Sequence, residues 1–480
     1  MTAPYAFYLD AAFCSGCKAC QAACKDKNNL PPGVLWRRVY EVSGGDWEHT
    51  GQAWTNTVFA YNLSVACNHC VHPKCAGVCP VDAYTVRPDG IVLLDSSQCI
   101  GCGYCAWACP YAAPQYDRSA GYMSKCNFCF DNIDAGLPPA CIAACPMRVL
   151  EYGEATDDQT PVEGFMGLWE TPAGAHPFPL PNYSRTQPHL AIKPHPAMAM
   201  ELEKSVANWE EVKPQARSGW EELPLIVFTL LLQMAVGGFW AISWMFMPFW
   251  ELVQADTAWL RLLPSLLIGF SLALGMTASF THLGTKKNAW RAIIHIRKSW
   301  LSREILLALL FGTAWLLTAV AVILMGHTPA LLGWLTALLG FGLVYSMSQV
   351  YRLRAVPAWN TLRTEVGFLI SAVLLGQLLM ACVLAYESQL TGVQIPSAQW
   401  RATGLSTLAL LAMRAWATHQ HAPRPRAERL WRVLLLASML LVSASLLAPG
   451  LDLSRASLAV FLMVLVEESV ARWLFYASRP

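Results

Sequence analysis

The chain has 480 residues, of which 55% are hydrophobic and only 14% are charged. Soluble globular proteins average about 25% charged residues, so this composition excludes a protein that is soluble throughout. The formal net charge is +2, and the first half has no basic tract with interleaved aromatic residues. No nucleic-acid partner is therefore expected.

Composition divides the chain into two parts with different solvents. Residues 1 to about 220 are rich in Cys, Pro and Gly, whereas residues 223–480 are dominated by Leu, Ala, Val, Phe and Trp. A water-soluble part followed by a lipid-embedded part explains this change. We predict a soluble domain over residues 1–195, a linker over residues 196–220 and a transmembrane anchor over residues 221–480.

Sixteen of the 17 cysteines lie in the first part and fall into four quartets. The gaps within the first and third quartets are two, two and three residues; those of the second are two, four and three, and those of the fourth two, eleven and three. A proline directly follows each of the last three quartets. The quartets are Cys14, Cys17, Cys20 and Cys24; Cys67, Cys70, Cys75 and Cys79; Cys99, Cys102, Cys105 and Cys109; and Cys126, Cys129, Cys141 and Cys145.

Three chemistries compete for these cysteines. C-x2-C pairs are poor disulfide partners by geometry, and the chain shows no export signal of its own. Structural zinc uses two C-x2-C pairs, or Cys with His, and does not call for further thiolates at gaps of two and three. The C-x2-C-x2-C-x3-C-P run is instead the bacterial ferredoxin signature, in which three closely spaced thiolates hold one cubane cluster. Gly16 and Gly101 give the tight loop the backbone freedom that it requires.

In this signature the fourth cysteine of a run binds the other cluster of the pair. The second and third quartets are therefore predicted to form one two-cluster module, with the first and fourth quartets forming a second module around it. Four [4Fe-4S] clusters in a row serve to carry single electrons over a distance, which predicts an electron-transfer function. The predicted ligand sets are cluster A, Cys67, Cys70, Cys75 and Cys109; cluster B, Cys99, Cys102, Cys105 and Cys79; cluster C, Cys14, Cys17, Cys20 and Cys145; and cluster D, Cys126, Cys129, Cys141 and Cys24.

The second part contains eight apolar runs, and about 20 apolar residues suffice for a helix to cross a bilayer. The sixth and seventh runs carry the weakest signal. The predicted fold is an α+β double bacterial-ferredoxin-like domain with four cubane clusters, followed by an all-α eight-helix transmembrane bundle. The runs cover about 223–250, 259–283, 303–326, 330–351, 366–387, 401–418, 431–448 and 456–476.

Basic residues in the predicted connections favour one orientation. If the first helix starts on the side of the cluster domain, the connections that return to this side hold 14 Lys and Arg residues, against Arg261, Arg401 and Arg455 on the other side. The positive-inside rule then predicts a cytoplasmic cluster domain, whereas export together with a partner would make that domain periplasmic. The 14 residues are Lys286, Lys287, Arg291, Arg297, Lys298, Arg303, Arg352, Arg354, Arg363, Arg414, Arg424, Arg426, Arg429 and Arg432.

The histidines of the second part argue against haem. A transmembrane haem usually needs two facing histidines at matched depth. His282 and His327 are predicted at opposite faces of the membrane, and His295 is predicted in a connection. No haem is therefore expected.

Ionisable residues gather where the second predicted helix ends and the third begins. A quinone site needs a neutral group that hydrogen-bonds a carbonyl and a carboxylate that carries protons. His282, Ser302, Arg303 and Glu304 supply these groups, and we predict that they form such a site. The structural alternative is a histidine at a helix end and an interfacial Arg–Glu pair.

Several segments resemble a known enzyme family. The cysteine-rich segments 5–26, 67–80, 99–116 and 141–153 closely resemble the iron–sulfur subunit of dimethyl sulfoxide reductase. From about residue 219 the chain resembles the membrane anchor of that enzyme, and the two subunits look fused. The anchor resemblance rests on 219-GWEELPLIVFTLLLQ-233, 282-HLG-284, 299-SWLSREI-305 and 356-VPAWNT-361.

The resemblance implies a molybdopterin oxidoreductase complex in the bacterial inner membrane, used in anaerobic respiration. A separate catalytic subunit would hold a molybdenum (or tungsten) bis-pterin, and menaquinone or ubiquinone would be the membrane substrate. The anchor family has no haem and handles quinone near the histidine that matches His282. Related nitrate reductases replace the second cysteine of the third quartet with Trp, but Cys102 is present here, so four cubanes are expected.

The resemblance leaves the direction of electron flow open. Quinol would feed a sulfoxide, polysulfide or other oxyanion reductase, or a sulfite dehydrogenase of the same three-part plan would feed quinone. A hypothesis of a different class is a membrane transporter or proton pump with an iron–sulfur regulatory head. That hypothesis predicts ionisable residues inside several helices, which the apolar runs do not suggest.

Overall fold

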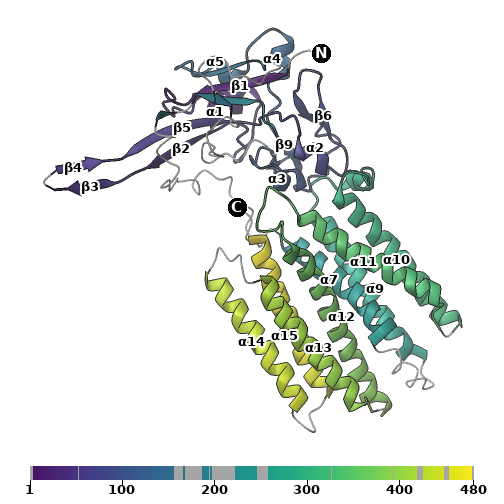
Figure 1. Ribbon diagram of the computed structural model, residues 1–480. Coiled ribbons are helices and arrows are strands. Elements are labelled where there is room, and N and C mark those ends of the chain that lie inside the picture. The colour runs from purple at the N-terminus through teal and green to yellow at the C-terminus, as the bar shows by residue number, and fades with distance from the viewer. Residues whose placement is uncertain are drawn as a thin grey trace. The chain divides into compact units, whose positions relative to one another are not determined.

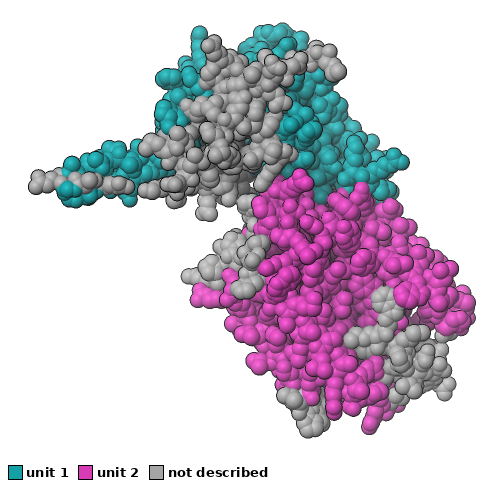
Figure 2. Space-filling model, viewed as in Figure 1, with its two compact units in different colours: residues 1–215, 284–299 teal, residues 216–283, 300–480 magenta. Residues whose placement is uncertain are grey.

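A computed structural model describes the chain in eleven stretches, and the chain divides into two compact units (Figure 2). The first unit comprises residues 1–215 and 284–299, and the second comprises residues 216–283 and 300–480. Apart from Pro196, the predicted linker 196–220 lies outside the described residues. The described residues are 4–51, 53–155, 166–167, 186–193, 195–196, 222–245, 258–325, 327–392, 394–418, 425–447 and 453–477.

A four-stranded sheet joins the start of the first unit to its later segments. Strand β1 (Tyr5–Asp10) pairs antiparallel with β10 (Leu150–Glu154) and parallel with β12 (Leu190–Lys193), which pairs with β11 (Met166–Gly167). Leu9, near the end of β1, lies opposite Leu150 at the start of β10. The segment that follows β1 and the segment that precedes β10 therefore lie at the same end of this strand pair. The first and fourth cysteine quartets occupy these two flanking segments, so the sheet brings them together.

Short hairpins and an arm complete the β structure of this unit. Strands β6 (Tyr84–Val86) and β7 (Val92–Leu94) follow the second quartet, and β8 (Gln115–Asp117) and β9 (Tyr122–Ser124) follow the third. The long arm seen in Figure 1 consists of the antiparallel pair β2 and β5, extended by the pair β3 and β4. The arm strands are Arg38–Gly44, Trp47–Thr50, Ala53–Asn56 and Phe59–Val65.

Five short helices carry or follow the cysteines. Helix α1 (Ala19–Lys27) packs against α5 (Ala140–Ala143), and α2 (Lys74–Val78) packs against α3 (Tyr104–Ala108). The fifth, α4 (Phe130–Asp134), follows Cys129. One helix pair joins the outer quartets and the other joins the inner quartets, so the ferredoxin-type domain predicted from the cysteine spacing is confirmed.

The second unit consists of long helices. Within the described residues, six of them are long and apolar enough to cross a membrane, namely α7, α9, α10, α11, α12 and α14, whereas α13 and α15 of the predicted eight-helix bundle are not apolar enough by this measure. This confirms the helical membrane part. Most helices begin and end within six residues of the predicted runs. The first run is an exception, because it continues past α7 into a π-helical turn over Ala241–Met245. The helices are α7 (Leu223–Trp240), α9 (Ala258–Thr281), α10 (Trp300–Met325), α11 (Ala330–Tyr351), α12 (Leu362–Thr391), α13 (Ser397–Thr418), α14 (Pro425–Leu447) and α15 (Leu453–Ala477).

Two glycines allow a close contact between α7 and α12. A Cβ atom at Gly237 of α7 would lie 1.7 Å from the carbonyl oxygen of Ala372 in α12, and one at Gly376 would lie 2.0 Å from the backbone of Gly237. Both distances are far below van der Waals contact, so only glycine fits at either position. The backbones of α7 and α12 therefore touch directly, as small residues permit in membrane bundles.

Two predictions about charged residues are wrong. Arg414 is predicted in a connection, but it lies in α13 with 7% of its surface exposed. The apolar runs also suggest helices without buried ionisable residues, whereas Glu467, Glu468 and Arg472 of α15 are all at most 2% exposed. Four such residues share the C-terminal helices because they compensate one another's charge, which a hydropathy average cannot detect.

Candidate functional site

Two cavities in the first unit are each lined by four cysteines. One contains Cys67, Cys70 and Cys75 of the second quartet together with Cys109 of the third. Each cavity has a volume of about 20 Å³, and each set combines three cysteines of one quartet with one from another. The sets are those predicted for clusters A and C; the second cavity is lined by Cys14, Cys17, Cys20 and Cys145.

The remaining cysteines gather in the same crossed manner. Burial raises the pKa of Cys102 to about 12, and the neighbouring charges of Cys79 and Cys99 add to this rise. Burial likewise raises the pKa of Cys24 to about 12, with further contributions from Cys141 and Cys129. Cys79 is thus near cysteines of the third quartet and Cys24 near those of the fourth, as in the sets predicted for clusters B and D.

Backbone N–H groups point at several of these thiols. The N–H of Gly101 lies 3.3 Å from Cys99 Sγ, and the N–H of Ala83 lies 3.4 Å from Cys79 Sγ. Gly16 and Gly101 both have φ of +69°, which lets the loop turn back on itself. Such donors stabilise the negative charge that thiolates and sulfides carry in a cluster.

The cysteine arrangement fits cubane clusters better than single ions. Within the described part of the chain, no three His, Cys, Asp or Glu side chains converge closely enough to hold one metal ion, whereas zinc requires thiolates about 2.3 Å from a common centre. Cysteines that surround a cavity at greater spacing would suit a cubane cluster, in which each thiolate binds a different iron atom. Because burial disfavours the thiolate, positive iron at these positions would provide the compensating charge.

A buried arginine lies between the cysteines of two predicted clusters. Arg37 is 1% exposed, its guanidinium lies 4.5 Å from the centre of the Phe7 ring, and it donates to the Ser64 carbonyl over 3.1 Å. The Ser64 hydroxyl in turn lies 3.2 Å from Cys20 Sγ. The thiols that act electrostatically on Arg37 are Cys141, Cys126, Cys20 and Cys24, which belong to the sets predicted for clusters C and D.

Replacing Arg37 with glutamine is expected to lower the reduction potentials of clusters C and D, because loss of a fixed positive charge disfavours the added electron. Potentiometric titration followed by EPR measures this shift. The matched variant is Arg38→Gln, since Arg38 is also buried but acts on Cys109 of cluster A. An equal shift of all four clusters in the Arg37 variant would contradict the prediction.

A segment distant in sequence packs onto the predicted cluster B. Residues 284–299, which connect α9 to α10, belong to the first unit. The Nδ1 atom of His295 lies 3.0 Å from the Cys79 carbonyl, and Asn288 donates to the Cys99 carbonyl over 3.3 Å. The segment therefore contacts the backbone of two cysteines predicted to bind the same cluster.

The four residues predicted for a quinone site lie beside this segment in the sequence. His282 directly follows α9, with Nδ1 3.0 Å from the Ser279 carbonyl. Ser302 and Glu304 are buried near the start of α10, and the guanidinium of Arg303 lies 4.2 Å from the centre of the Trp300 ring. One carboxylate oxygen of Glu304 has no hydrogen-bond partner, which suits a group that awaits a ligand or proton.

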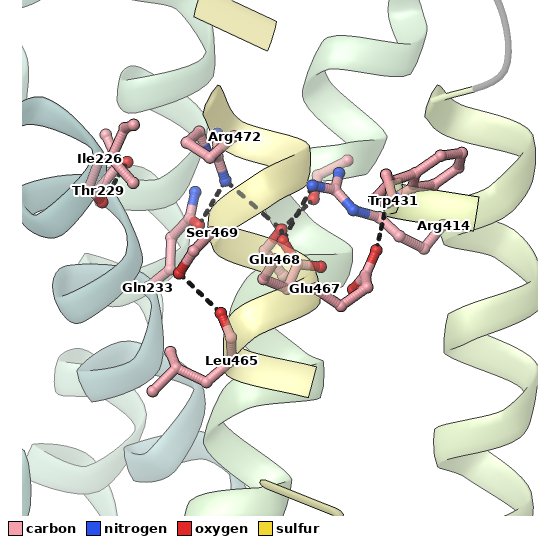
Figure 3. A network of polar contacts seen from close by, with 12 residues as sticks. Ile226, Thr229, Gln233, Arg414, Trp431, Leu465, Glu467, Glu468, Ser469 and Arg472 are labelled. Carbon is pink, nitrogen blue, oxygen red and sulfur yellow. Dashed lines mark hydrogen bonds and ion pairs between the residues drawn. The ribbon is translucent and has the colours of Figure 1, made fainter. Parts of the chain in front are cut away.

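Sequence reasoning missed a polar network in the second unit (Figure 3). Glu468 accepts hydrogen bonds from Arg414 over 2.9 Å and from Ser371 over 2.8 Å. Arg472 donates to Gln233 over 2.8 Å, and Trp431 donates to Glu467 over 2.5 Å. The signal in the sequence was the spacing of Glu468 and Arg472 by four residues, which places both on one face of a helix.

Comparisons with known families match two separate segments of the chain. Residues 58–155 match the family described as 4Fe-4S dicluster domain. Residues 216–422 match the family described as DMSO reductase anchor subunit (DmsC). The iron–sulfur and anchor parts predicted from the sequence therefore each have a family counterpart in one polypeptide.

Individual relatives resemble the first unit. The B subunit of the anaerobic dimethyl sulfoxide reductase of Escherichia coli is 44% identical over 195 residues, which are 41% of this chain and 91% of the relative. The same subunit of Haemophilus influenzae is 42% identical over 192 residues, covering 40% and 89%. The formate dehydrogenase iron–sulfur subunit of Wolinella succinogenes is 40% identical over 171 residues, covering 31% of this chain and 80% of that subunit.

Proposed function

Because this protein belongs to the dimethyl sulfoxide reductase family, as an iron–sulfur subunit fused to a membrane anchor, we propose that it passes electrons between membrane quinone and a separate catalytic subunit. The observation that supports this most directly is that eight of the cysteines line two cavities in crossed sets of four. The clusters, when bound, supply one-electron transfer. The chain provides the thiolates, the N–H donors and the buried cations around them.

Four [4Fe-4S] clusters are proposed, with the ligand sets A to D predicted above. Each set takes three cysteines from one quartet and the fourth from its partner quartet, which links the clusters of a module pairwise. Arg37 supports the outer module and Arg38 the inner one, since each places a fixed positive charge near buried thiols. This pairing favours electron transfer because neighbouring clusters share one continuous protein segment.

Cluster B is the proposed point of exchange with quinone. Its Cys79 and Cys99 receive backbone contacts from His295 and Asn288 of the segment that connects α9 to α10. His282 precedes this segment by two residues, and α10 follows it directly. Few residues of the chain therefore separate the segment that contacts these cysteines from the candidate quinone residues.

The quinone site is proposed to consist of His282, Ser302, Arg303 and Glu304. His282 and Ser302 would hydrogen-bond the quinone carbonyl, and Glu304 would accept or deliver the proton that accompanies each electron. Arg303, stacked on Trp300, would hold a positive charge near the reacting oxygen. Menaquinone and ubiquinone both present the carbonyl that these groups recognise.

The proposed partner is a molybdopterin catalytic subunit, since the relatives are subunits of dimethyl sulfoxide reductase and formate dehydrogenase. These names describe a reductase and a dehydrogenase, and a row of clusters conducts in either direction. The partner's substrate therefore sets the direction. Sulfoxide or another oxyanion would accept electrons from quinol, whereas sulfite would donate them to quinone.

We propose a cytoplasmic cluster unit. The connection 284–299, with its basic residues, belongs to that unit, as expected if the first helix starts on the side of the cluster domain. Removing Arg414, which is buried in α13, still leaves 13 basic residues near the helix ends of this side and three on the other. The positive-inside rule continues to favour the same orientation.

Iron and sulfide analysis tests the four-cluster proposal directly. The purified full-length protein is expected to contain about 16 iron atoms and about 16 acid-labile sulfides, as four cubanes require. A transporter with an iron–sulfur regulatory head would need far fewer iron atoms. The buried charges of α13 and α15 are a feature expected of such a transporter, so the iron content distinguishes the two hypotheses. A value near four would refute the electron-transfer proposal in favour of that alternative.

A further inference from the structure

A cavity of about 70 Å³ lies between the ends of four helices of the second unit. Its lining comes from the first turns of α12 and α14 and the last turns of α13 and α15. Three lining side chains are arginines, namely Arg363, Arg414 and Arg472, and the one lining carboxylate is Glu428. The site is distinct from the cysteine cavities and from the four residues proposed for quinone.

The charges around this cavity do not balance. Glu428 forms an ion pair with Arg432 on its own helix, and Arg414 forms one with Glu468 over 2.9 Å. Among the described residues neither Arg363 nor Arg472 forms an ion pair with a carboxylate, which leaves positive charge unpaired at the cavity. The local surplus favours an anion within the cavity.

Two of the arginines have donor atoms available for a ligand. Arg472 is 2% exposed, hydrogen-bonds the neutral Gln233 and lies 3.9 Å from the centre of the Phe368 ring, and its Nε has no partner. Arg363 lies 4.9 Å from the centre of the Trp416 ring, and its buried Nη1 has no partner. An unsatisfied buried N–H is costly, so a bound acceptor at both positions would be favourable.

The helix starts strengthen the preference for an anion. Helix α12 begins at Leu362 after Thr361, whose side chain makes no capping hydrogen bond. Thr361 and Thr364 both line the cavity. The partial positive charge at a helix N-terminus attracts phosphate groups.

We propose that this cavity binds the phosphate of an anionic phospholipid, with Arg363 and Arg472 as the phosphate-binding side chains. A guanidinium donates two parallel hydrogen bonds that match phosphate oxygens. The cavity lies at the ends of membrane-length helices α12 and α14, where headgroups are found. Basic pockets between transmembrane helices are known binding sites for anionic headgroups.

Native mass spectrometry of the full-length protein tests this proposal. The protein in detergent is titrated with phosphatidylglycerol or with phosphatidylcholine, and one phosphatidylglycerol is expected to stay bound under conditions that remove phosphatidylcholine. Arg363→Gln is expected to weaken this binding at least tenfold. Arg363 is only partly buried, and its guanidinium packs over the ring of Trp416. Replacing Arg363 is therefore expected to leave the Arg414–Glu468 pair intact.

Arg354→Gln is the matched control, since Arg354 is exposed in the connection that precedes α12 and does not line the cavity. This variant is expected to bind phosphatidylglycerol as the unaltered protein does. Equal retention of both lipids, or unchanged binding in Arg363→Gln, would overturn the proposal. A third arm adds inorganic phosphate alone: binding of phosphate with no retained phosphatidylglycerol would assign the cavity to a free anion and also overturn it.

Discussion

Replacing Cys109 with serine is expected to abolish or convert cluster A, although Cys109 belongs to the third quartet and three of the ligands of cluster A belong to the second. The four cysteines line one cavity, and serine is a much poorer ligand for iron than thiolate. EPR spectroscopy of the reduced protein is expected to lose one of four signals. Iron content should fall by up to about four atoms of about 16.

The crossed assignment is tested by comparing variants across quartets. Cys67→Ser is expected to affect the same signal as Cys109→Ser, and the double variant should lose no further signal. Cys102→Ser should instead alter cluster B, while the helices remain inserted. If Cys109→Ser and Cys102→Ser changed the same signal, the uncrossed arrangement would be correct. Cys382→Ser in α12 controls for the loss of a cysteine outside the quartets.

Replacing Glu304 with glutamine is expected to reduce quinol-linked turnover of the complex by about 100-fold or more, which is the usual effect of removing a general acid or base. Turnover with an artificial dye donor should persist, because the dye delivers electrons without the membrane site. Glutamine keeps the volume of the buried carboxylate and cannot carry a proton. His282→Ala is expected to have the same effect by removing a hydrogen bond to the quinone.

The control for Glu304 is Glu365→Gln. Glu365 also lies in the first turn of a membrane-length helix, but it forms an ion pair with Arg352 and a hydrogen bond of 2.9 Å with Gln349. Its replacement should leave quinol-linked turnover nearly unchanged. Full quinol-linked activity in both the Glu304 and His282 variants would move the quinone site elsewhere in the anchor.

The cysteine spacing predicted most of the first unit. Short gaps force three thiolates onto one loop, and that constraint is local enough to be recognised without a structure. The nested order of the modules followed from the same pattern, and the pairing of β1 with β10 provides its physical basis. Helix positions in the second unit were also predictable, since lipid demands long apolar runs.

The sequence alone did not indicate where Arg37 or Arg414 would lie. Arg37 stands well apart in sequence from Cys126 and Cys141, whose charges act on it, and only folding brings them together. Arg414 lies close to the end of a predicted apolar run, and only its ion pair with Glu468 in α15 explains its burial. A buried charge is tolerated only where a partner compensates it, and here the partner lies in a different helix.

The sequence by itself therefore predicted the iron–sulfur domain, its candidate cysteine ligands and the apolar segments of the membrane part, because these features depend on residues close together in the chain. Tertiary structure alone decided that residues 284–299 pack on cysteines of the predicted cluster B and that four helix ends enclose an arginine-lined cavity. These arrangements depend on hydrogen bonds and charge pairs between residues more than 40 positions apart. Spacing and hydropathy contain no information about such contacts.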